Sequence, residues 1–312
     1  MATSNPAMAL KGFSLYDKLT GSWGKAAVIG VPMLFLLVVF MLPFLVVFKI
    51  SLSEMDVVFF KDILTWTGEA ITLTVKFGNY VSLTQDSLYF EAYLSSLKFA
   101  GITTVICLAI AYPFAYFLAR SPADKRPALL MLVMLPFWTS FLLRVYAWKM
   151  LLSDSGVFNN VAIAMGLIEE PIKMMNTPFS LVLGMVYTYV PFMILPLYAN
   201  LVKMDLRLLE AALDLGATPW QAFWRITVPL SKSGIIAGSM LVFIPCVGEF
   251  VIPELLGGPQ TLMIGRVLWD EFFSNNDWPI AATVAVVMVL LIIVPLALFN
   301  KYQAESTQGG RS

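Results

Sequence analysis

The sequence predicts an all-α, polytopic membrane protein with six transmembrane helices. Of its 312 residues, 59% are hydrophobic and 13% are charged, whereas a soluble domain is about 45–50% apolar and about 25% charged. The mean hydropathy is +0.81. A water-soluble fold has too little interior to hide this much apolar surface, and a lipid bilayer removes that constraint.

Six apolar stretches reach the length of about 20 residues with which a helix crosses a hydrocarbon core of about 30 Å. They are Ala26–Phe48, Ser96–Ala119, Ala128–Leu152, Phe179–Leu201, Gly234–Leu256 and Pro279–Phe299. The first is too long for a signal peptide, and no A-x-A cleavage site follows it. We therefore expect one membrane domain over residues 26–302, between an N-terminal segment (1–25) and a polar tail (303–312).

The lysines and arginines between these stretches predict the orientation, because cytoplasmic loops are enriched in both. Twelve of them fall in four segments that share one side: Lys11, Lys18, Lys25, Arg120, Lys125, Arg126, Lys203, Arg207, Arg225, Lys232, Lys301 and Arg311. The opposite loops hold only Lys61, Lys76, Lys173 and Arg266, with Lys49, Lys98 and Lys149 near span ends. Both termini are therefore predicted to be cytoplasmic.

The first external loop, residues 51–92, is long and acidic. Within it, Ile71–Phe77 alternates apolar and polar residues, which predicts a short strand or an edge lying on the membrane.

Several classes of function find no support in the composition. The formal net charge is zero, so overall charge gives no reason to expect a nucleic-acid partner, and the chain has no histidine. Cys107 and Cys246 fall inside apolar stretches and form no CxxC pair, so we expect buried thiols and neither a disulfide nor a metal site. No G-x-x-x-x-G-K-[ST] phosphate loop occurs, so we expect no cofactor or nucleotide on this chain. A membrane enzyme is disfavoured because no nucleophile–base pair is visible.

The segment Leu209–Pro229, in the predicted cytoplasmic loop 203–232, reads as two short amphipathic helices. Gly216 is expected to end the first helix. Thr218 is a candidate N-cap for the second, with Pro219 at the first helical position and Gln221 three residues after the cap. Trp220, Phe223, Trp224 and Thr227 are expected along one face, and Pro229 is expected to stop the helix. Amphipathicity alone is compatible with helices that lie on lipid and with a knob that inserts into a soluble partner.

The same segment resembles the EAA loop of binding-protein-dependent ABC importer permeases. The family pattern E-A-A-x3-G-x9-I-x-L-P matches at every spacing, and the one departure is Val228 in place of leucine. The resemblance implies a type I ABC importer permease (MetI-like) fold and a loop that docks on a separate ATPase subunit, which would hold ATP and Mg. The residues that carry the match are Glu210, Ala211, Ala212, Gly216, Ile226 and Pro229.

Two ionisable residues fall at membrane depth, where such residues are costly and usually functional. Glu249 lies in the fifth stretch between Pro245, Gly248 and Pro253, which weaken the helix there. A broken helix with a carboxylate is suited to a cation pathway. A structural ion pair with Arg144, in the third stretch, explains it equally well. For Arg144 itself we expect a structural or gating role, because an arginine repels cations.

Further residues are candidates for the same pathway. Trp138, Tyr146, Tyr187 and Tyr189 offer aromatic faces to ammonium groups, although such rings more often pack in the protein or at the membrane interface. The acids Glu254, Asp270 and Glu271 lie near the predicted external mouth. A solvated loop is the commoner explanation for them.

A closer resemblance covers about residues 24–302. The stretches PFWTSFLLRVYAW, VGEFVIPELLGGP, IGRVLWDEFF and LPFLVVFKISLSEM resemble the permeases of bacterial spermidine/putrescine ABC importers, the putrescine type in particular. This resemblance implies a complex in the bacterial inner membrane: a heterodimer with a second, homologous permease, together with a cytoplasmic ATPase dimer and a periplasmic polyamine-binding protein. It also implies a small cationic substrate. The alternatives are an ABC importer permease for another solute and a secondary transporter that an ion gradient drives.

Overall fold

The computed structural model describes residues 22–55, 64–66, 71–73 and 76–308. The chain divides into two units, residues 1–76 and residues 77–312, and each is described by itself. Most of the predicted N-terminal segment, with Lys11 and Lys18, lies outside the described residues. So do Lys61, Arg311 and residues 74–75 of the predicted strand.

The first unit holds helix α2 (Ser22–Ser51) and strands β1 (Leu64–Trp66) and β2 (Ile71–Leu73). Helix α2 is apolar on all sides, which is typical of a membrane span, and it confirms the first predicted stretch. The two strands are antiparallel, with Thr65 opposite Thr72. The strand expected from Ile71 onward is thus confirmed over its first three residues.

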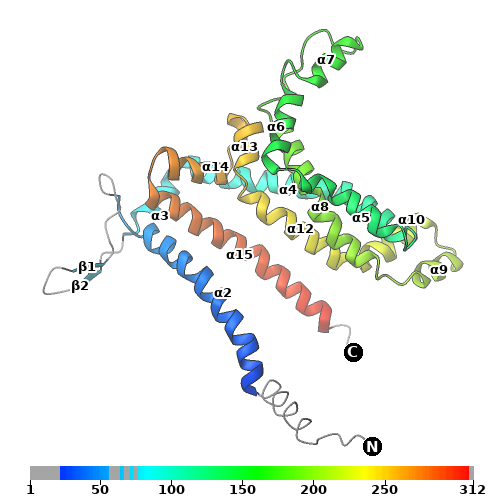
Figure 1. Ribbon diagram of the computed structural model, residues 1–312, viewed down its shortest axis with the longest axis horizontal. Coiled ribbons are helices and arrows are strands. Elements are labelled where there is room, and N and C mark those ends of the chain that lie inside the picture. Colours follow the sequence, from blue (N-terminus) through cyan, green and yellow to red (C-terminus); the bar gives the residue numbers. More distant parts are fainter. Residues whose placement is uncertain (1–21, 56–63, 67–70, 74–75, 309–312) are drawn as a thin grey trace, which may run out of the picture. The chain divides into compact units, whose positions relative to one another are not determined.

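The second unit is built on three helices that lie side by side: α4 (Ser87–Arg120), α8 (Pro178–Leu201) and α12 (Lys232–Val247) (Figure 1). Their shared core consists of fully buried apolar side chains, among them Met185, Met193, Leu197 and Val242. Cys107 and Cys246 lie in this core as free thiols, as the sequence predicts. A short helix, α3 (Gly78–Gln85), precedes α4.

The third predicted stretch is not one helix, and that expectation is corrected. It consists of α5 (Arg126–Met134), the 3₁₀ turn η1 (Leu135–Trp138) and α6 (Phe141–Leu152), and α7 (Val157–Ala164) follows. The two halves meet at a bend of 80°. Pro136 has no N–H to continue the helix, and the hydroxyl of Thr139 donates to the Pro136 carbonyl at 2.7 Å. The break is therefore stabilised locally.

The fifth predicted stretch is also interrupted. Helix α12 ends at Val247 and α13 (Val251–Leu256) begins after Gly248, whereas Pro245 stays inside α12. The chain continues through the 3₁₀ turn η3 (Pro259–Thr261), α14 (Ile264–Trp269) and the π-helical turn η4 (Asp270–Ser274). It ends in α15 (Trp278–Gln308), so the predicted tail from residue 303 is helical as far as Gln308.

Helices α2, α4 and α8 are each long and apolar enough to cross a membrane, among the residues that the structure describes. Two bent pairs pass the same test together: Arg126–Trp138 with Phe141–Ala164, and Pro219–Leu230 with Lys232–Val247. The shorter apolar helix Trp278–Ile293 corresponds to the last predicted stretch. Each predicted stretch thus has a helical counterpart among the described residues. Five candidate spans follow if each bent pair is counted as one, and the sixth predicted stretch is represented by the shorter helix.

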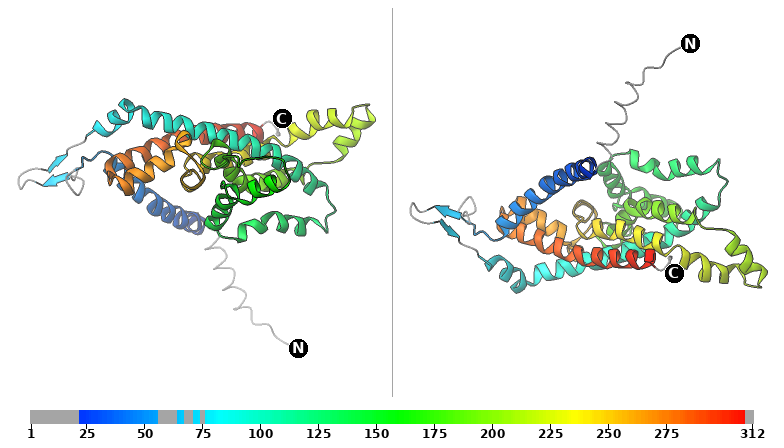
Figure 2. Two further views of the ribbon diagram at one scale, coloured as in Figure 1. Left: turned by 90° about the horizontal axis from the view of Figure 1, so that it is seen from above. Right: turned by 90° about the horizontal axis from the view of Figure 1, so that it is seen from below.

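The 203–232 loop lies at one end of the second unit. It forms α9 (Arg207–Asp214), α10 (Pro219–Ala222), the π-helical turn η2 (Phe223–Thr227) and α11 (Val228–Leu230). Figures 1 and 2 show α9 and α10 beyond one end of the three central helices, whereas α3 and α14 lie at the opposite end.

Candidate functional site

The turn of the 203–232 loop is built as its sequence predicts. Gly216 has a φ of +86°, a left-handed conformation that favours glycine, and it ends α9. The Thr218 hydroxyl accepts from the backbone N–H of Gln221 at 3.3 Å, and the Gln221 side chain accepts from the N–H of Thr218 at 3.0 Å. This reciprocal capping fixes the direction in which α10 leaves the turn.

The helix after the turn ends close to where the sequence predicts, because Pro219–Leu230 stops one residue after Pro229 and the chain bends by 65° into Lys232–Val247. The four residues expected on one face, however, are divided, since η2 widens the helix. Phe223 and Thr227 turn inward, whereas Trp220 and Trp224 stay 69% and 52% exposed.

An exposed apolar surface therefore covers the outside of the loop. Leu215 is 89% exposed beside the turn, and Leu208 and Leu213 are about half exposed on α9. Glu210 is also exposed, in the first turn of α9. Clustered exposed apolar side chains with a polar rim usually mark a site of interaction with protein or membrane.

The second group of candidates surrounds the break after α12. Glu249 lies between α12 and α13 and is partly buried. Its Oε2 accepts from the hydroxyl of Tyr189 at 2.6 Å, and its Oε1 accepts from the backbone N–H groups of Val251 and Ile252 at 3.0 and 3.4 Å. All of these donors are neutral. Within the described residues no lysine or arginine pairs with this carboxylate.

The alternative ion pair between Glu249 and Arg144 is not formed in the described part of the chain. The guanidinium of Arg144 lies over the ring of Phe137, 5.1 Å from its centre. Its Nε and Nη1 are buried and have no hydrogen-bond partner among the described residues. Both intramembrane charges predicted from the sequence therefore lack a counter-charge in this arrangement.

A series of aromatic rings connects the two charges, and two of these rings, Phe137 and Phe192, were not predicted from the sequence. Phe137 meets Phe192 edge to face at 5.1 Å between ring centres, and Phe192 lies 6.1 Å from Tyr189. Phe192 is three residues after Tyr189 on α8, so helical spacing was a signal that could have found it. Phe137 comes from a different segment, and only the fold brings it here.

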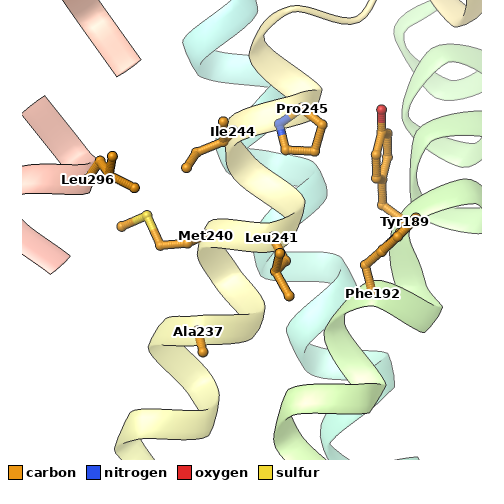
Figure 3. A pocket seen from close by; sticks show the side chains of 8 residues that line it. All are labelled: Tyr189, Phe192, Ala237, Met240, Leu241, Ile244, Pro245 and Leu296. Carbon is orange, nitrogen blue, oxygen red and sulfur yellow. The ribbon is translucent and has the colours of Figure 1, made fainter. Parts of the chain in front are cut away.

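Tyr189 and Phe192 also line an apolar groove of about 560 Å³ along α12 (Figure 3). Its other walls are Ala237, Met240, Leu241, Ile244 and Pro245 of α12, and Leu296 of α15. The figure shows the two α8 side chains on one side of α12 and Leu296 on the other. Such a lining suits hydrocarbon and offers no charged side chain to a cation.

The other pathway candidates are not gathered around Glu249. Tyr187 packs edge to face against Trp148, 5.4 Å between ring centres. Residues two apart on a helix do not share a face, so Tyr187 and Tyr189 point in different directions. Trp138 is 78% exposed and Tyr146 is half exposed.

The three acids after the break have different surroundings. Glu254 forms an ion pair with Arg266 at 2.7 Å, and Asp270 lies 4.0 Å from the same nitrogen, Nε. Glu271 is not solvated, contrary to expectation: it is buried and accepts from the Tyr89 hydroxyl at 2.7 Å and from the Asn275 amide at 2.9 Å. Within the described residues, no three His, Cys, Asp or Glu side chains are placed to hold a metal ion.

Comparison with known proteins places this architecture among transport proteins. Residues 111–307 match the family described as "Binding-protein-dependent transport system inner membrane component". The chain is 42% identical over 236 residues to the spermidine/putrescine transport system permease protein PotB of Haemophilus influenzae, with 76% of this chain and 81% of that protein covered. It is 44% identical over 228 residues to PotB of Escherichia coli, with 72% and 82% covered.

A solved structure has the same fold. It is the crystal structure of a bacterial ABC transporter involved in the import of the acidic polysaccharide alginate, with a TM-score of 0.67 and 18% identity. The match covers 94% of this chain and 99% of the other chain. At this identity the likeness concerns the fold alone.

Proposed function

The chain belongs to the family of binding-protein-dependent transport system inner membrane components, and we propose that it is a permease subunit of an ATP-driven polyamine importer. The observation that carries the substrate class is the identity of 42–44% to two spermidine/putrescine permeases over 228–236 residues. As a member of this family the chain is a multi-pass inner-membrane permease. The predicted orientation, with both termini in the cytoplasm, is part of the proposal.

The energy for transport comes from a separate subunit in this proposal. The chain has no phosphate loop, so ATP and Mg bind on a cytoplasmic ATPase dimer. The 203–232 loop docks there through Glu210, Ala211, Ala212, Gly216, Ile226 and Pro229. The exposed side chains Leu215, Trp220 and Trp224 support this role, because they offer apolar surface beside an exposed carboxylate.

A second, homologous permease and a periplasmic polyamine-binding protein complete the complex. ATP binding and the docked binding protein favour the outward-open state, since a ligand shifts a conformational equilibrium only through different affinities for the two states. The substrate then crosses between the two permeases.

Glu249 is the proposed cation contact on this path. Its carboxylate has only neutral donors among the described residues, and an unpaired charge at membrane depth is costly. A polyamine ammonium supplies the missing counter-charge while the Tyr189 ring offers a cation–π face. Trp138, Tyr187 and Glu254 are assigned to the approach, and Arg144 to a structural or gating role.

Transport by the reconstituted complex tests the proposal. The chain is co-expressed with its ATPase and partner permease, and uptake of labelled putrescine and spermidine is measured in proteoliposomes with the binding protein. We expect uptake to require ATP. Glu210→Ala should weaken ATPase docking by about 2 kcal/mol, or about thirtyfold, if Glu210 is a central docking residue. Glu249→Gln should reduce uptake while assembly and basal ATP hydrolysis persist.

Two exposed acids serve as controls, because both lie outside the 203–232 loop and away from Glu249. Glu169→Ala is the control for Glu210→Ala, and Glu91→Gln is the control for Glu249→Gln. If the complex moves another solute on ATP but neither polyamine, the family assignment stands and the substrate is wrong. If uptake proceeds without any ATPase, the chain is a secondary transporter and the coupling role of the loop is wrong.

A further inference from the structure

The 203–232 loop is attached to α4 by a group of side chains that the proposed function leaves unused. This group, the loop–α4 contact, consists of Tyr112 and Tyr116 on α4 with Phe223 and Ser231 in the loop. The ring of Phe223 lies 5.5 Å from that of Tyr112 and 5.9 Å from that of Tyr116, and both pairs meet edge to face. This is a favourable arrangement for aromatic rings, so a movement of the loop that keeps these contacts also displaces the two tyrosines.

A buried hydrogen bond joins Tyr112 to Ser231, which lies at a bend in the chain. The hydroxyl oxygens of Tyr112 and Ser231 are 2.8 Å apart. The Ser231 hydroxyl also donates to the carbonyl of Val228 at 3.0 Å, so Tyr112 donates to Ser231. Ser231 lies at the 65° bend between Pro219–Leu230 and Lys232–Val247. Tyr112 thus holds the residue about which the loop turns relative to α12.

The turn that carries Phe223 has an unsatisfied group. Phe223 is the first residue of η2, and π-helical turns inside helices are frequent at functional sites. The hydroxyl of Thr227, at the other end of η2, is buried and has no hydrogen-bond partner within the described residues. A buried polar group without a partner is unfavourable. A rearrangement that gives the Thr227 hydroxyl a hydrogen-bond partner therefore stabilises this turn.

The packing of α4 on α8 connects the loop–α4 contact to Glu249. The Thr103 hydroxyl lies 3.8 Å from the sulfur of Met185, and the Cys107 thiol 3.8 Å from the carbonyl oxygen of Val186, so α4 is packed closely on α8. Tyr189, which bonds to Glu249, follows on the same helix. A displacement of α4 is therefore passed to the helix that positions the carboxylate, because close-packed interiors transmit strain.

We propose that the loop–α4 contact transmits movement of the 203–232 loop to the membrane helices. Phe223 displaces the two tyrosines, and the bond between Tyr112 and Ser231 makes α4 follow the hinge. This inference rests on the proposed function, since it takes the loop to be the part that the ATPase moves. Tyr112, Phe223 and Ser231 are positioning residues in it: they act on the pathway through α4 and α8 and touch neither ATP nor polyamine.

Tyr112→Phe tests this, with Tyr93→Phe as the matched control. Tyr93 is also on α4 and its hydroxyl donates to the carbonyl of Val284 at 2.7 Å, so each variant loses one tyrosine hydrogen bond from the same helix. In proteoliposomes of the whole complex, we measure putrescine taken up per ATP hydrolysed. We expect Tyr112→Phe to lower this ratio about fivefold, the factor that corresponds to one neutral hydrogen bond, and Tyr93→Phe to leave it unchanged.

A double variant distinguishes transmission of movement through the Tyr112–Ser231 hydrogen bond from a general loss of helix packing. If the bond is the link, Tyr112→Phe combined with Ser231→Ala lowers the ratio no further than Ser231→Ala alone. Equal ratios in Tyr112→Phe and Tyr93→Phe, or independent effects of the two changes, would overturn the inference and leave the proposed function intact. A parent complex without ATP-dependent uptake would instead remove the proposed function, and the inference with it.

Discussion

Gly216 is the residue on which the geometry of the docking loop depends most directly. Its φ of +86° is in the left-handed region, and no atom lies within 4 Å of the position that a Cβ would take. A substitution is therefore opposed by backbone conformation and not by crowding. We expect Gly216→Ala to destabilise the loop by about 1 kcal/mol and Gly216→Asn by less, because asparagine tolerates this conformation better.

The affinity of the purified permease for its ATPase subunit measures this effect. Gly101→Ala in α4 is the control, because Gly101 also has open space around it but lies in a regular helix, where alanine is favoured. Unchanged affinity in Gly216→Ala would show that the left-handed turn is not needed for docking.

Individual residues also show how far the pathway could be predicted. Glu249 and Tyr189 could be singled out from the sequence, because a charge at membrane depth and an aromatic ring are each conspicuous there. Their hydrogen bond could not, since the two residues are 60 positions apart and meet only where α8 packs beside the break. For the same reason, the ion pair between Glu254 and Arg266 and the hydrogen bond between Glu271 and Tyr89 could not be predicted from the sequence.

At the scale of elements, hydrophobicity and length were enough to predict the apolar stretches from the sequence. The positions at which the helices are interrupted depend on local hydrogen bonding. The break after α12 was expected from Pro245, Gly248 and Pro253, of which Pro245 stays inside α12. The 80° bend after η1 was not, because Pro136 lies in a stretch whose composition is otherwise that of a continuous span.

The segment around α7, residues 153–172, provides a test of one such local element. Asn159 is 1% exposed, and its side chain bonds to the carbonyls of Ser153 and Ile172 and to the N–H of Ile172. Asn159→Ala leaves these groups unpaired, at a cost of about 1–3 kcal/mol. We expect faster hydrogen exchange over residues 153–172. Asn160→Ala is the control, because Asn160 is exposed and makes one such bond; equal exchange in both variants would contradict the role of Asn159.

At the scale of the whole molecule, the proposed function requires the segment around α7 (residues 153–172) and the 203–232 loop to lie on opposite sides of the membrane. Helix α8 is the only candidate span between them. Its 24 residues extend about 36 Å at 1.5 Å per residue, enough to cross a hydrocarbon core of about 30 Å. The lysines and arginines of the 203–232 loop predict that this loop lies in the cytoplasm.

Cysteine labelling checks this arrangement, because Cys107 and Cys246 are buried and give little background. Met165 and Leu215 are 67% and 89% exposed on the two sides. A membrane-impermeant maleimide should label Met165→Cys but not Leu215→Cys in cells with a permeabilised outer membrane, and the reverse in inverted vesicles. Labelling of Leu215→Cys from outside alone would mean the opposite orientation, which would place the docking loop where no ATPase can reach it. Labelling of both from one side would mean that α8 does not span the membrane.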